Sequence, residues 1–338
     1  MHLNKHPTIL VLGTGGTIAG LATDPENPIN YKASQLGITD ILRRSGLDNQ
    51  NLECRDIAKI DSKDMGPVVW RDLLKALSEA CDRPDLQAIV ITHGTDTLEE
   101  TAYLLNALGP WKKPLVLTCA MKPANAADAD GPGNLRDALA LAGLNGIPSV
   151  SMVCAGQVHD PLYLQKTRTD QADGFSSGPS GPLGWMVDGQ WRPAKQLEKA
   201  PPKTKSDAIP SLQALLATPA WPRVEWVTNH AGNAGDIVHA LLDHRADASA
   251  PLRGLVVAAT GSGTASLGME AALASACQAG IRVVICSRPA WGRVVGQHPK
   301  AWGSPSALSP AKAWVSLSLA LLAEDENIKK PGRPGLGL

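Results

Sequence analysis

The stretch from Ala88 to Leu105 constrains the fold more than any other part of the chain. Its first five residues, 88–92, form a short apolar, β-branched run that is typical of a buried strand. From residue 98 onward the apolar positions follow helical spacing, since Leu98, Ala102 and Leu105 fall on one face. A buried strand that passes directly into a helix is the building unit of a mostly parallel α/β sheet.

The four residues between this strand and this helix, His-Gly-Thr-Asp at 93–96, form a tight turn. Its glycine permits the turn, and Thr95 and Asp96 lie at its tip. Thr97 followed by Glu100 has the pattern of a capping box, which predicts that the helix begins there. The tip is the carboxyl end of a strand, where open α/β sheets bind ligands, and its free N–H groups suit an anion such as a carboxylate.

Strands and helices alternate along the first 154 residues. We predict strands at 8–12, 54–60, 88–92, 114–119 and 149–154, and helices at 39–44, 70–80, from 98 onward and at 135–142. From Gly156 the alternation weakens, and Lys166 and the GPSGPLG turn fall in irregular or antiparallel structure. The pattern predicts an α/β fold whose larger N-terminal domain has a mostly parallel sheet flanked by helices.

A second, smaller α/β unit follows a segment that is rich in Lys, Pro and Ala. We predict an N-terminal domain at 1–200, a linker at 201–222 and a C-terminal domain at 223–338. The polar residues 324–338 are expected to be frayed. The expected elements of this unit are strands at 224–228, 254–260 and 281–286, and helices at 236–242, 265–279 and 311–323.

The composition excludes several classes of function. Thirty-two basic residues balance thirty-two acidic ones, so we expect neither nucleic acid nor an anionic membrane as a partner. The first thirteen residues are too short and too quickly broken by glycine for a signal peptide, and no apolar run reaches about 18 residues. The six cysteines form no CxxC pair, which favours reduced thiols and a cytoplasmic protein.

A second glycine-rich turn, GTGGTIAG at 13–20, follows the first predicted strand. It fails the dinucleotide fingerprint because Ile18 stands at the third glycine position. It fails the P-loop pattern because Leu21 and Ala22 follow its last glycine. His239 and His244 are five residues apart rather than four, so a zinc site is not expected either. No cofactor and no metal are therefore predicted.

Thr17 in this turn and Thr95 in the HGTD turn are the strongest candidates for chemistry. Parallel strands end on the same edge of a sheet, so the two hydroxyl groups can converge. A threonine hydroxyl needs a base and an oxyanion site, which Asp96, a buried lysine and turn N–H groups could supply. The alternative interpretation is that both threonines only cap helices. The aperiodic segment 21–37, which contains Tyr31, is a candidate lid.

TGGTIAG and ITHGTDTLEETAYLL together resemble the two signature motifs of the bacterial-type L-asparaginase/glutaminase family. The similarity continues through Asp61-Ser62, Asp64-Met65, AMKP, ADGPGNL, Lys166-Thr167 and GPLG, and thus covers nearly the whole first domain. The second domain matches mainly in its strand pattern and in LSPAKA. The resemblance implies a cofactor-free L-asparaginase that works through a threonine nucleophile and an acyl-enzyme.

The resemblance also implies a role for each matching residue. Thr17 matches the nucleophile, and Tyr31 matches the lid tyrosine close to it. Thr95, Lys166 and Asp96 match a trio that assists proton transfer and water activation.

The substrate-binding residues follow from the same resemblance. Ser62 matches the residue that holds the substrate α-carboxylate, and Asp96 also meets the α-amino group. The Ala120 carbonyl lies where the family contacts the leaving amide. The family is usually a homotetramer built from dimers, with each site completed by the smaller domain of a neighbouring subunit.

The chain departs from the family pattern near the substrate α-carbon. Lys63, included among the substrate-binding residues, stands where many members carry glutamine, and Ser262 stands where an asparagine usually contributes. The family pattern also has a glutamate in the loop after Ser287-Arg288. This glutamate has no counterpart here, because residues 291–303 contain no acid. The cysteine that would pair with Cys81 in secreted relatives is also absent.

Three alternatives stay open beside an asparaginase, and the departures at Lys63 and at the missing glutamate motivate the second of them. They are a glutaminase-asparaginase, an amidase for a related amide without a free α-amino group, and a non-catalytic amide-binding module.

Overall fold

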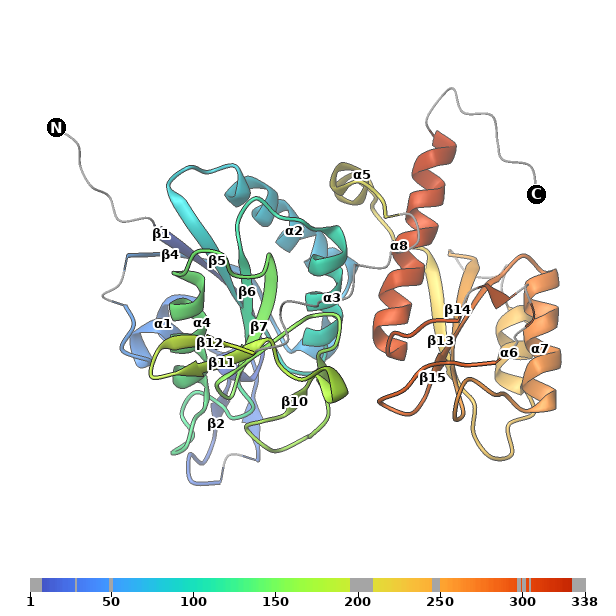
Figure 1. Cartoon of the computed structure of the whole chain (residues 1–338), viewed down its shortest axis with the longest axis horizontal. Helices are drawn as coiled ribbons and strands as arrows, with labels where there is room; N and C mark the ends of the chain where they lie inside the picture. Colours follow the sequence, from blue (N-terminus) through green and yellow to red (C-terminus); the bar gives the residue numbers. More distant parts are fainter. Residues whose placement is uncertain are drawn as a thin grey trace. The chain divides into compact units, whose positions relative to one another are not determined.

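The computed structural model describes residues 8–27, 29–48, 51–194, 209–244, 250–296, 299, 302–303 and 305–329. Contacts between Cα atoms divide the chain into two compact units, Met1–Pro202 and Lys203–Leu338 (Figure 1). Each unit has its own sheet and its own hydrophobic core. The division into domains at 1–200 and 223–338 with a linker at 201–222 stays a prediction.

The first unit is built on an eight-stranded sheet in the order β12-β11-β8-β7-β6-β5-β1-β4. The strands from β4 to β7 are parallel, and β8, β11 and β12 continue the sheet in antiparallel pairing. The predicted fold class is thereby confirmed. The strands are β1 Thr8–Gly15, β4 Leu52–Ile60, β5 Leu86–Thr92, β6 Leu115–Thr118, β7 Val150–Cys154, β8 Gln157–His159, β11 Gly184–Val187 and β12 Gln190–Pro193.

The parallel strands have the order of a doubly wound fold. The chain runs from β1 outward to β4 and then returns past β1 to β5, so the strand order reverses between β1 and β5. Such a switch point leaves a crevice outside the carboxyl ends of the two strands, and ligands bind there. Both threonine-bearing turns follow these two strands.

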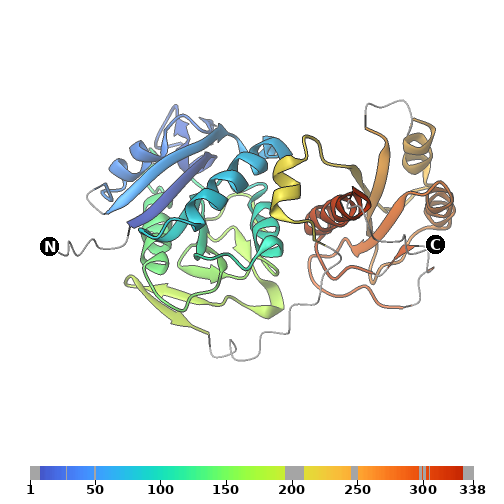
Figure 2. The same ribbon diagram turned by 90° about the horizontal axis from the view of Figure 1, so that it is seen from above.

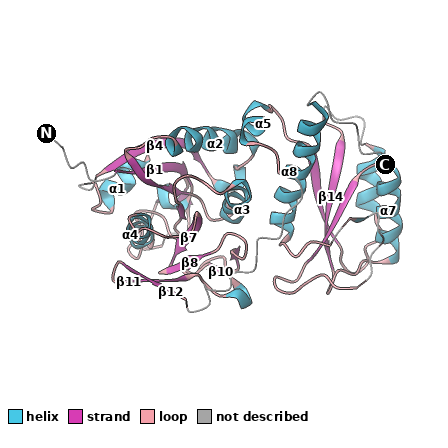
Figure 3. Ribbon diagram, turned by 45° about the horizontal axis from the view of Figure 1, so that its top comes forward, coloured by secondary structure: helices cyan, strands magenta, loops and turns pink. Residues whose placement is uncertain are grey.

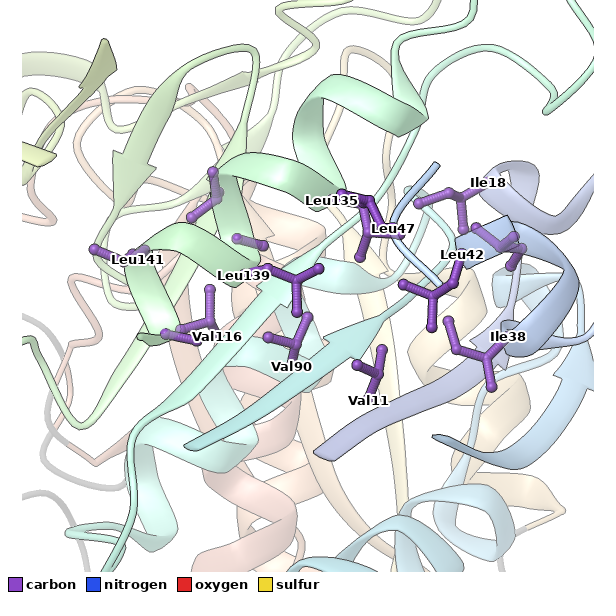
Figure 4. Close-up of a cluster of buried hydrophobic side chains, with 14 of the residues drawn as sticks. Val11, Ile18, Ile38, Leu42, Leu47, Val90, Val116, Leu135, Leu139 and Leu141 are labelled. Atoms are coloured by element: carbon purple, nitrogen blue, oxygen red, sulfur yellow. The ribbon is translucent and has the colours of Figure 1, made fainter. Parts of the chain in front are cut away.

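Among the described residues of this unit, four helices cover the two faces of the sheet. Figure 3 shows this arrangement. Helices α1 (Ile38–Arg44) and α4 (Gly131–Ala142) lie on one face, and α2 (Pro67–Cys81) and α3 (Leu98–Leu108) lie on the other. On the first face, valines of β1, β5 and β6 pack under leucines of the two helices, as Figure 4 shows. The labelled members of this core are Val11, Ile18, Ile38, Leu42, Leu47, Val90, Val116, Leu135, Leu139 and Leu141.

Helix α3 begins at Leu98 as predicted, but the predicted capping box is absent. The Thr97 hydroxyl makes no capping bond and instead donates to the Ser62 carbonyl at 2.7 Å. The Thr97 hydroxyl therefore bonds a distant carbonyl and not the backbone of its own helix, and the prediction of a capping box was wrong.

Short elements complete the first unit around the carboxyl edge of the sheet. The predicted lid is not entirely irregular, since its residues 21–22 and 31–32 pair as antiparallel strands β2 and β3. Lys166 lies in an antiparallel pair, β9 with β10, within the segment that was expected to be irregular or antiparallel. These elements are η1 Thr17–Ala19, β2 Leu21–Ala22, β3 Tyr31–Lys32, η2 Ser62–Asp64, β9 Gln165–Lys166, β10 Phe175–Ser176 and η3 Gly178–Ser180.

The second unit is a parallel sheet in the order β13-β14-β15. Helices α6 and α7 pack on one face and α8 packs on the other, as Figure 2 shows in orange and red. Helix α5 lies within the segment predicted as a linker. The bounds are α5 Leu212–Ala217, β13 Arg223–Thr228, α6 Asp236–Asp243, β14 Leu252–Ala259, α7 Leu267–Gln278, β15 Arg282–Ser287 and α8 Pro310–Lys329.

The expectation of frayed residues from 324 onward was wrong for the part that the structure describes. Helix α8 continues to Lys329 because its polar end is tied to the sheet. Arg253 forms an ion pair with Asp325 at 2.6 Å, and Arg282 forms one with Glu324. Residues 330–338 lie outside the described residues. Within the described part of the chain, no helix has the length and apolar character that a membrane crossing requires.

Candidate active site

The two threonine-bearing turns meet backbone to backbone at the switch point. A Cβ atom added to Gly16 would lie 2.2 Å from the Cα atom of Gly94, and one added to Gly94 would lie 3.0 Å from the Cα atom of Gly16. Gly16 also has a φ of +85°, which L side chains rarely adopt. Only glycine at both positions lets the turns approach this closely, and the approach brings together the turns that carry Thr17 and Thr95.

Thr17 is nearly buried and is hydrogen-bonded to the lid tyrosine. Its Oγ1 atom lies 2.8 Å from the Tyr31 hydroxyl, and 6% of its surface is exposed. The ring of Tyr31 approaches over Gly20, where a Cβ atom would lie 2.9 Å from the Cδ2 atom of the ring. The predicted nucleophile and its predicted neighbour are therefore brought together, with a hydroxyl group in place to exchange a proton with Thr17.

Asn125 holds the base of the lid and was missed by sequence reasoning. Its side-chain carbonyl accepts from the Ala22 backbone N–H at 2.7 Å, and its amide donates to the Ala22 carbonyl at 2.9 Å. The Ala124 N–H also donates to the Gly20 carbonyl at 2.9 Å. Since β2 pairs with β3, which carries Tyr31, these bonds fix where the tyrosine hydroxyl lies.

Ser34 is a second residue that sequence reasoning missed. Its Oγ atom accepts from the Gly16 N–H at 2.8 Å and donates to the Ile60 carbonyl at 2.5 Å. The Gly16 N–H also donates to the Ile60 carbonyl at 2.9 Å. The Gly16 N–H is therefore occupied by protein acceptors and is not free to act as an oxyanion donor.

The second threonine belongs to a charged hydrogen-bond network. The Lys166 Nζ atom donates to the Thr95 hydroxyl at 2.8 Å and to the Asp96 carboxylate at 2.6 Å. The Lys166 side chain is 21% exposed, and its backbone N–H donates to Glu99 at 3.2 Å. Because a lone pair of Thr95 is occupied by the ammonium group, the Thr95 proton remains available for donation.

Ser62 lies under the HGTD turn and is almost fully buried, with 2% of its surface exposed. Its Oγ atom accepts from the Asp96 backbone N–H at 3.1 Å, which leaves the hydroxyl proton free to donate to a ligand. Asp61 caps the short helix η2 by accepting from the Lys63 N–H. This cap places Ser62 at the start of η2, beside the network of Thr95.

Lys63 is solvent-exposed and paired with an acid. Its Nζ atom donates to Asp61 at 2.8 Å, and 65% of the lysine side chain is exposed. The hydrogen bond and charge of Asp61, followed by the charges of Asp64 and Asp96, raise the pKa of Lys63. Lys63 is thus a permanent cation that lies in the field of the Asp96 carboxylate.

The turn that carries Ala120 is fixed by the carboxylate of Asp130. Asp130 accepts from the backbone N–H groups of Met121 and Lys122, each at 2.9 Å. A Cβ atom added to Gly131 would lie 3.1 Å from Ile18, the neighbour of the predicted nucleophile, and 3.3 Å from the Cβ atom of Ala120. Ala120 therefore lies close to the first threonine turn.

His93 has a structural position, as predicted. Its Nδ1 atom faces the Gly94 carbonyl at 2.7 Å, so that nitrogen carries the proton. Its Nε2 atom then accepts from Thr101 at 2.9 Å, and Thr101 accepts from the Trp70 indole at 2.8 Å. Complete burial lowers the pKa of His93 to about 4, so the ring stays neutral and orients the Gly94 carbonyl.

The remaining sequence predictions concern a metal site and the positions of Ser262 and the loop at 291–303. The described residues contain no group of three or more His, Cys, Asp and Glu side chains that could hold a metal ion. Ser262 belongs to the second unit, in the loop after β14, where its carbonyl accepts from the Val295 N–H at 3.0 Å. Parts of the loop at 291–303 lie outside the described residues.

Comparison with known proteins covers both units. The family model for "Asparaginase, N-terminal" matches residues 8–199, and the model for "Glutaminase/Asparaginase C-terminal domain" matches residues 223–330. L-asparaginase 2 of Escherichia coli K12 is 34% identical over 329 residues, which covers 93% of this chain and 89% of that protein. The probable periplasmic L-asparaginase of Haemophilus influenzae is 32% identical over 324 residues, which covers 93% and 88%.

A solved structure matches the whole architecture. The crystal structure of a probable cytoplasmic L-asparaginase from Campylobacter jejuni superposes with a TM-score of 0.83 at 31% sequence identity. The match covers 96% of this chain and 98% of that chain.

Proposed function

The chain belongs to the asparaginase family, and from this premise we propose that it hydrolyses L-asparagine to L-aspartate and ammonia with Thr17 as the nucleophile. One observation carries the proposal. Two hydroxyl networks, Thr17 with Tyr31 and Thr95 with Lys166 and Asp96, lie on turns that touch at the switch point. Hydrolysis of an unactivated amide needs a nucleophile and a proton relay together, and the two networks supply both.

In the first half-reaction the Thr17 oxygen attacks the side-chain amide carbon of the substrate. As the C–O bond forms, the Thr17 proton passes to the Tyr31 oxygen while the tyrosine's own proton moves toward the amide nitrogen. The C–N bond then breaks, ammonia leaves, and an aspartyl ester remains on Thr17. The low exposure of Thr17 supports this order of events, because it keeps bulk water from the reacting carbon.

In the second half-reaction a water molecule attacks the ester carbon. One water proton returns to the Thr17 oxygen as the C–O bond breaks, and L-aspartate is released. The Thr95 hydroxyl orients this water, and the Lys166 ammonium stabilises the negative charge that develops on the Thr95 oxygen as protons move. Asp96 holds Lys166 in place through its 2.6 Å ion pair.

The backbone end of the substrate is bound by the residues around η2. The free proton of Ser62 donates to the α-carboxylate, and Asp96 receives the α-ammonium. The Ala120 carbonyl accepts a hydrogen bond from the leaving amide. The surrounding residues support these assignments, since Asp61 fixes the backbone that carries Ser62 and Asp130 fixes the turn that carries Ala120.

Ammonia release by the purified protein tests the proposal. We expect rapid release from L-asparagine by the natural chain, and a rate lowered by about 10²-fold or more in Thr17→Ala and Thr95→Ala. Thr39→Ala, on the exposed surface of α1, is the matched control and keeps the natural rate. If Thr17→Ala retains most of the rate, the assignment of the nucleophile is wrong.

The substrates compared in the same assay decide among the remaining functions. Release from L-glutamine at a rate similar to that from L-asparagine would make the protein a glutaminase-asparaginase. Release only from a des-amino amide would replace asparagine by a substrate without an α-amino group. Binding of asparagine without release of ammonia would indicate a non-catalytic amide-binding module.

The assembly and location follow the family in this proposal. The protein forms a homotetramer built from dimers, and analytical ultracentrifugation at micromolar concentration should give four chain masses. It acts in the cytoplasm, as the Campylobacter relative is described to do, whereas the Haemophilus relative is described as periplasmic. Cell fractionation of the source organism distinguishes the two compartments.

A further inference from the structure

The side chain of Lys63 is locked by its neighbour in the chain. The two oxygens of Asp61 contact both ends of this lysine, since Oδ1 accepts from its backbone N–H at 3.5 Å and Oδ2 accepts from Nζ at 2.8 Å. The lysine side chain is 65% exposed and the Asp61 side chain is 33% exposed. The ammonium group therefore takes part in a solvent-screened ion pair with Asp61.

This ammonium group lies next to the residues that receive the substrate's α-substituents. Lys63 follows Ser62 directly, and the Ser62 hydroxyl is bonded to the backbone N–H of Asp96 at 3.1 Å. The Asp96 carboxylate is already paired with Lys166 at 2.6 Å and is also within the field of Lys63. A substrate ammonium that approaches Asp96 therefore meets two cations, whereas a carboxylate that approaches Ser62 meets an attractive field.

We propose that the Asp61–Lys63 pair determines how the site ranks amides by the charge on their α-carbon. The Lys63 ammonium favours an amide that carries a carboxylate and no α-ammonium, such as succinamate, relative to zwitterionic L-asparagine. Asp61 weakens this preference because it partly neutralises Lys63. The inference rests on the proposed function, in particular on Ser62 and Asp96 as the receptors of the α-substituents.

The ratio of kcat/KM for succinamate to kcat/KM for L-asparagine tests the proposal. Because charges exposed to solvent interact weakly, we expect Lys63→Gln to lower the ratio only about two- to fivefold. Asp61→Asn, which removes the neutralising charge, raises the ratio by a similar factor. Lys63→Arg, which keeps the charge, leaves the ratio unchanged.

Two controls separate charge from structure. Lys112→Gln removes a similarly exposed lysine from its 2.6 Å pair with Asp82, and the ratio should not change. Raising the salt from about 0.01 M to about 1 M shortens the screening length from about 30 Å to about 3 Å and should remove the differences between variants. A merely structural role of Asp61 and Lys63 would change both substrates together and would not respond to salt.

The outcomes that overturn the inference differ from the one that overturns the function. An unchanged ratio in Lys63→Gln at low salt refutes the role of Lys63. A ratio that falls in both Lys63→Gln and Asp61→Asn refutes the opposing action of the two charges. If the natural chain releases ammonia from neither amide, the proposed function itself fails and the inference fails with it.

Discussion

Acidification should destabilise this protein through two buried neutral histidines. Burial lowers the pKa of His93 to about 4, and it lowers the pKa of His159 to about 4 as well. Both rings make hydrogen bonds in the first unit, His93 to Gly94 and His159 to Ser177 at 2.9 Å. An unfolded histidine has a pKa of about 6.5, so the unfolded chain binds protons that the folded chain does not. Stability is therefore present above pH 6.5 and falls as the pH drops toward 4.

The size of this effect follows from the two pKa values. Between pH 7 and pH 5 each histidine removes about 2 kcal/mol from the free energy of unfolding, and the two together remove about 4 kcal/mol. Below the folded pKa the folded chain binds the same protons, and the loss contributed by these two residues ends. The slope in the steep range approaches about 1.4 kcal/mol per pH unit for each residue.

Urea unfolding followed by tryptophan fluorescence at fixed protein concentration measures this loss. The natural chain, His93→Gln and the double variant His93→Gln/His159→Gln are compared at pH 7, 6 and 5. We expect the pH-dependent loss to fall by about half in the single variant and to be nearly absent in the double variant. If His93→Gln keeps the full slope of the natural chain, the buried neutral state assigned to His93 is wrong.

Three further substitutions test the geometry of the site. Gly16→Ala should abolish ammonia release and lower Tm, because its Cβ atom would lie 2.2 Å from the Cα atom of Gly94 in the HGTD turn. The control Gly46→Ala is also at positive φ but has nothing within 4 Å, so it should lower the free energy of unfolding by only about 1–2 kcal/mol. A similar loss in both variants would refute the packing argument. Tyr31→Phe should lower kcat about 10²-fold with Tm unchanged, and kcat within a factor of two would remove the tyrosine from the relay. Asn125→Ala frees the N–H and the carbonyl of Ala22 in strand β2, so KM should rise and limited proteolysis should cut the lid faster. An unchanged KM would mean that these bonds do not position the lid.

The fold could be predicted because its signals are local. Runs of apolar residues such as 88–92 and helical spacing such as that of Leu98, Ala102 and Leu105 reflect burial within a single element. The alternation of these elements was enough to predict the fold class, which the architecture and the matching family structure confirm. The same local signals predicted that both threonine turns follow strands and therefore share an edge of the sheet.

The residues that sequence reasoning missed depend on partners far away in the chain. Ser34 contacts the Ile60 carbonyl 26 residues away, and Asn125 contacts Ala22 at a separation of 103 residues. No local pattern marks such a pair. The capping box at Thr97 failed for the same reason, since the competing acceptor is the Ser62 carbonyl, 35 residues away. The roles assigned to Thr17 and Thr95 came from the family resemblance, and they stay proposals until activity is measured.

The central place of β1 in its sheet has a consequence during synthesis. β1 pairs with β4 along one edge. Its other edge stays unpaired until β5, which ends at Thr92, has been synthesised. While the ribosome adds the residues from Ile60 to Thr92, roughly 2 to 6 s pass at ordinary elongation rates. During this interval the nascent chain displays an open, apolar strand edge that can pair with another nascent chain. Slower translation between these two residues should therefore lower the yield of soluble protein without changing its final structure.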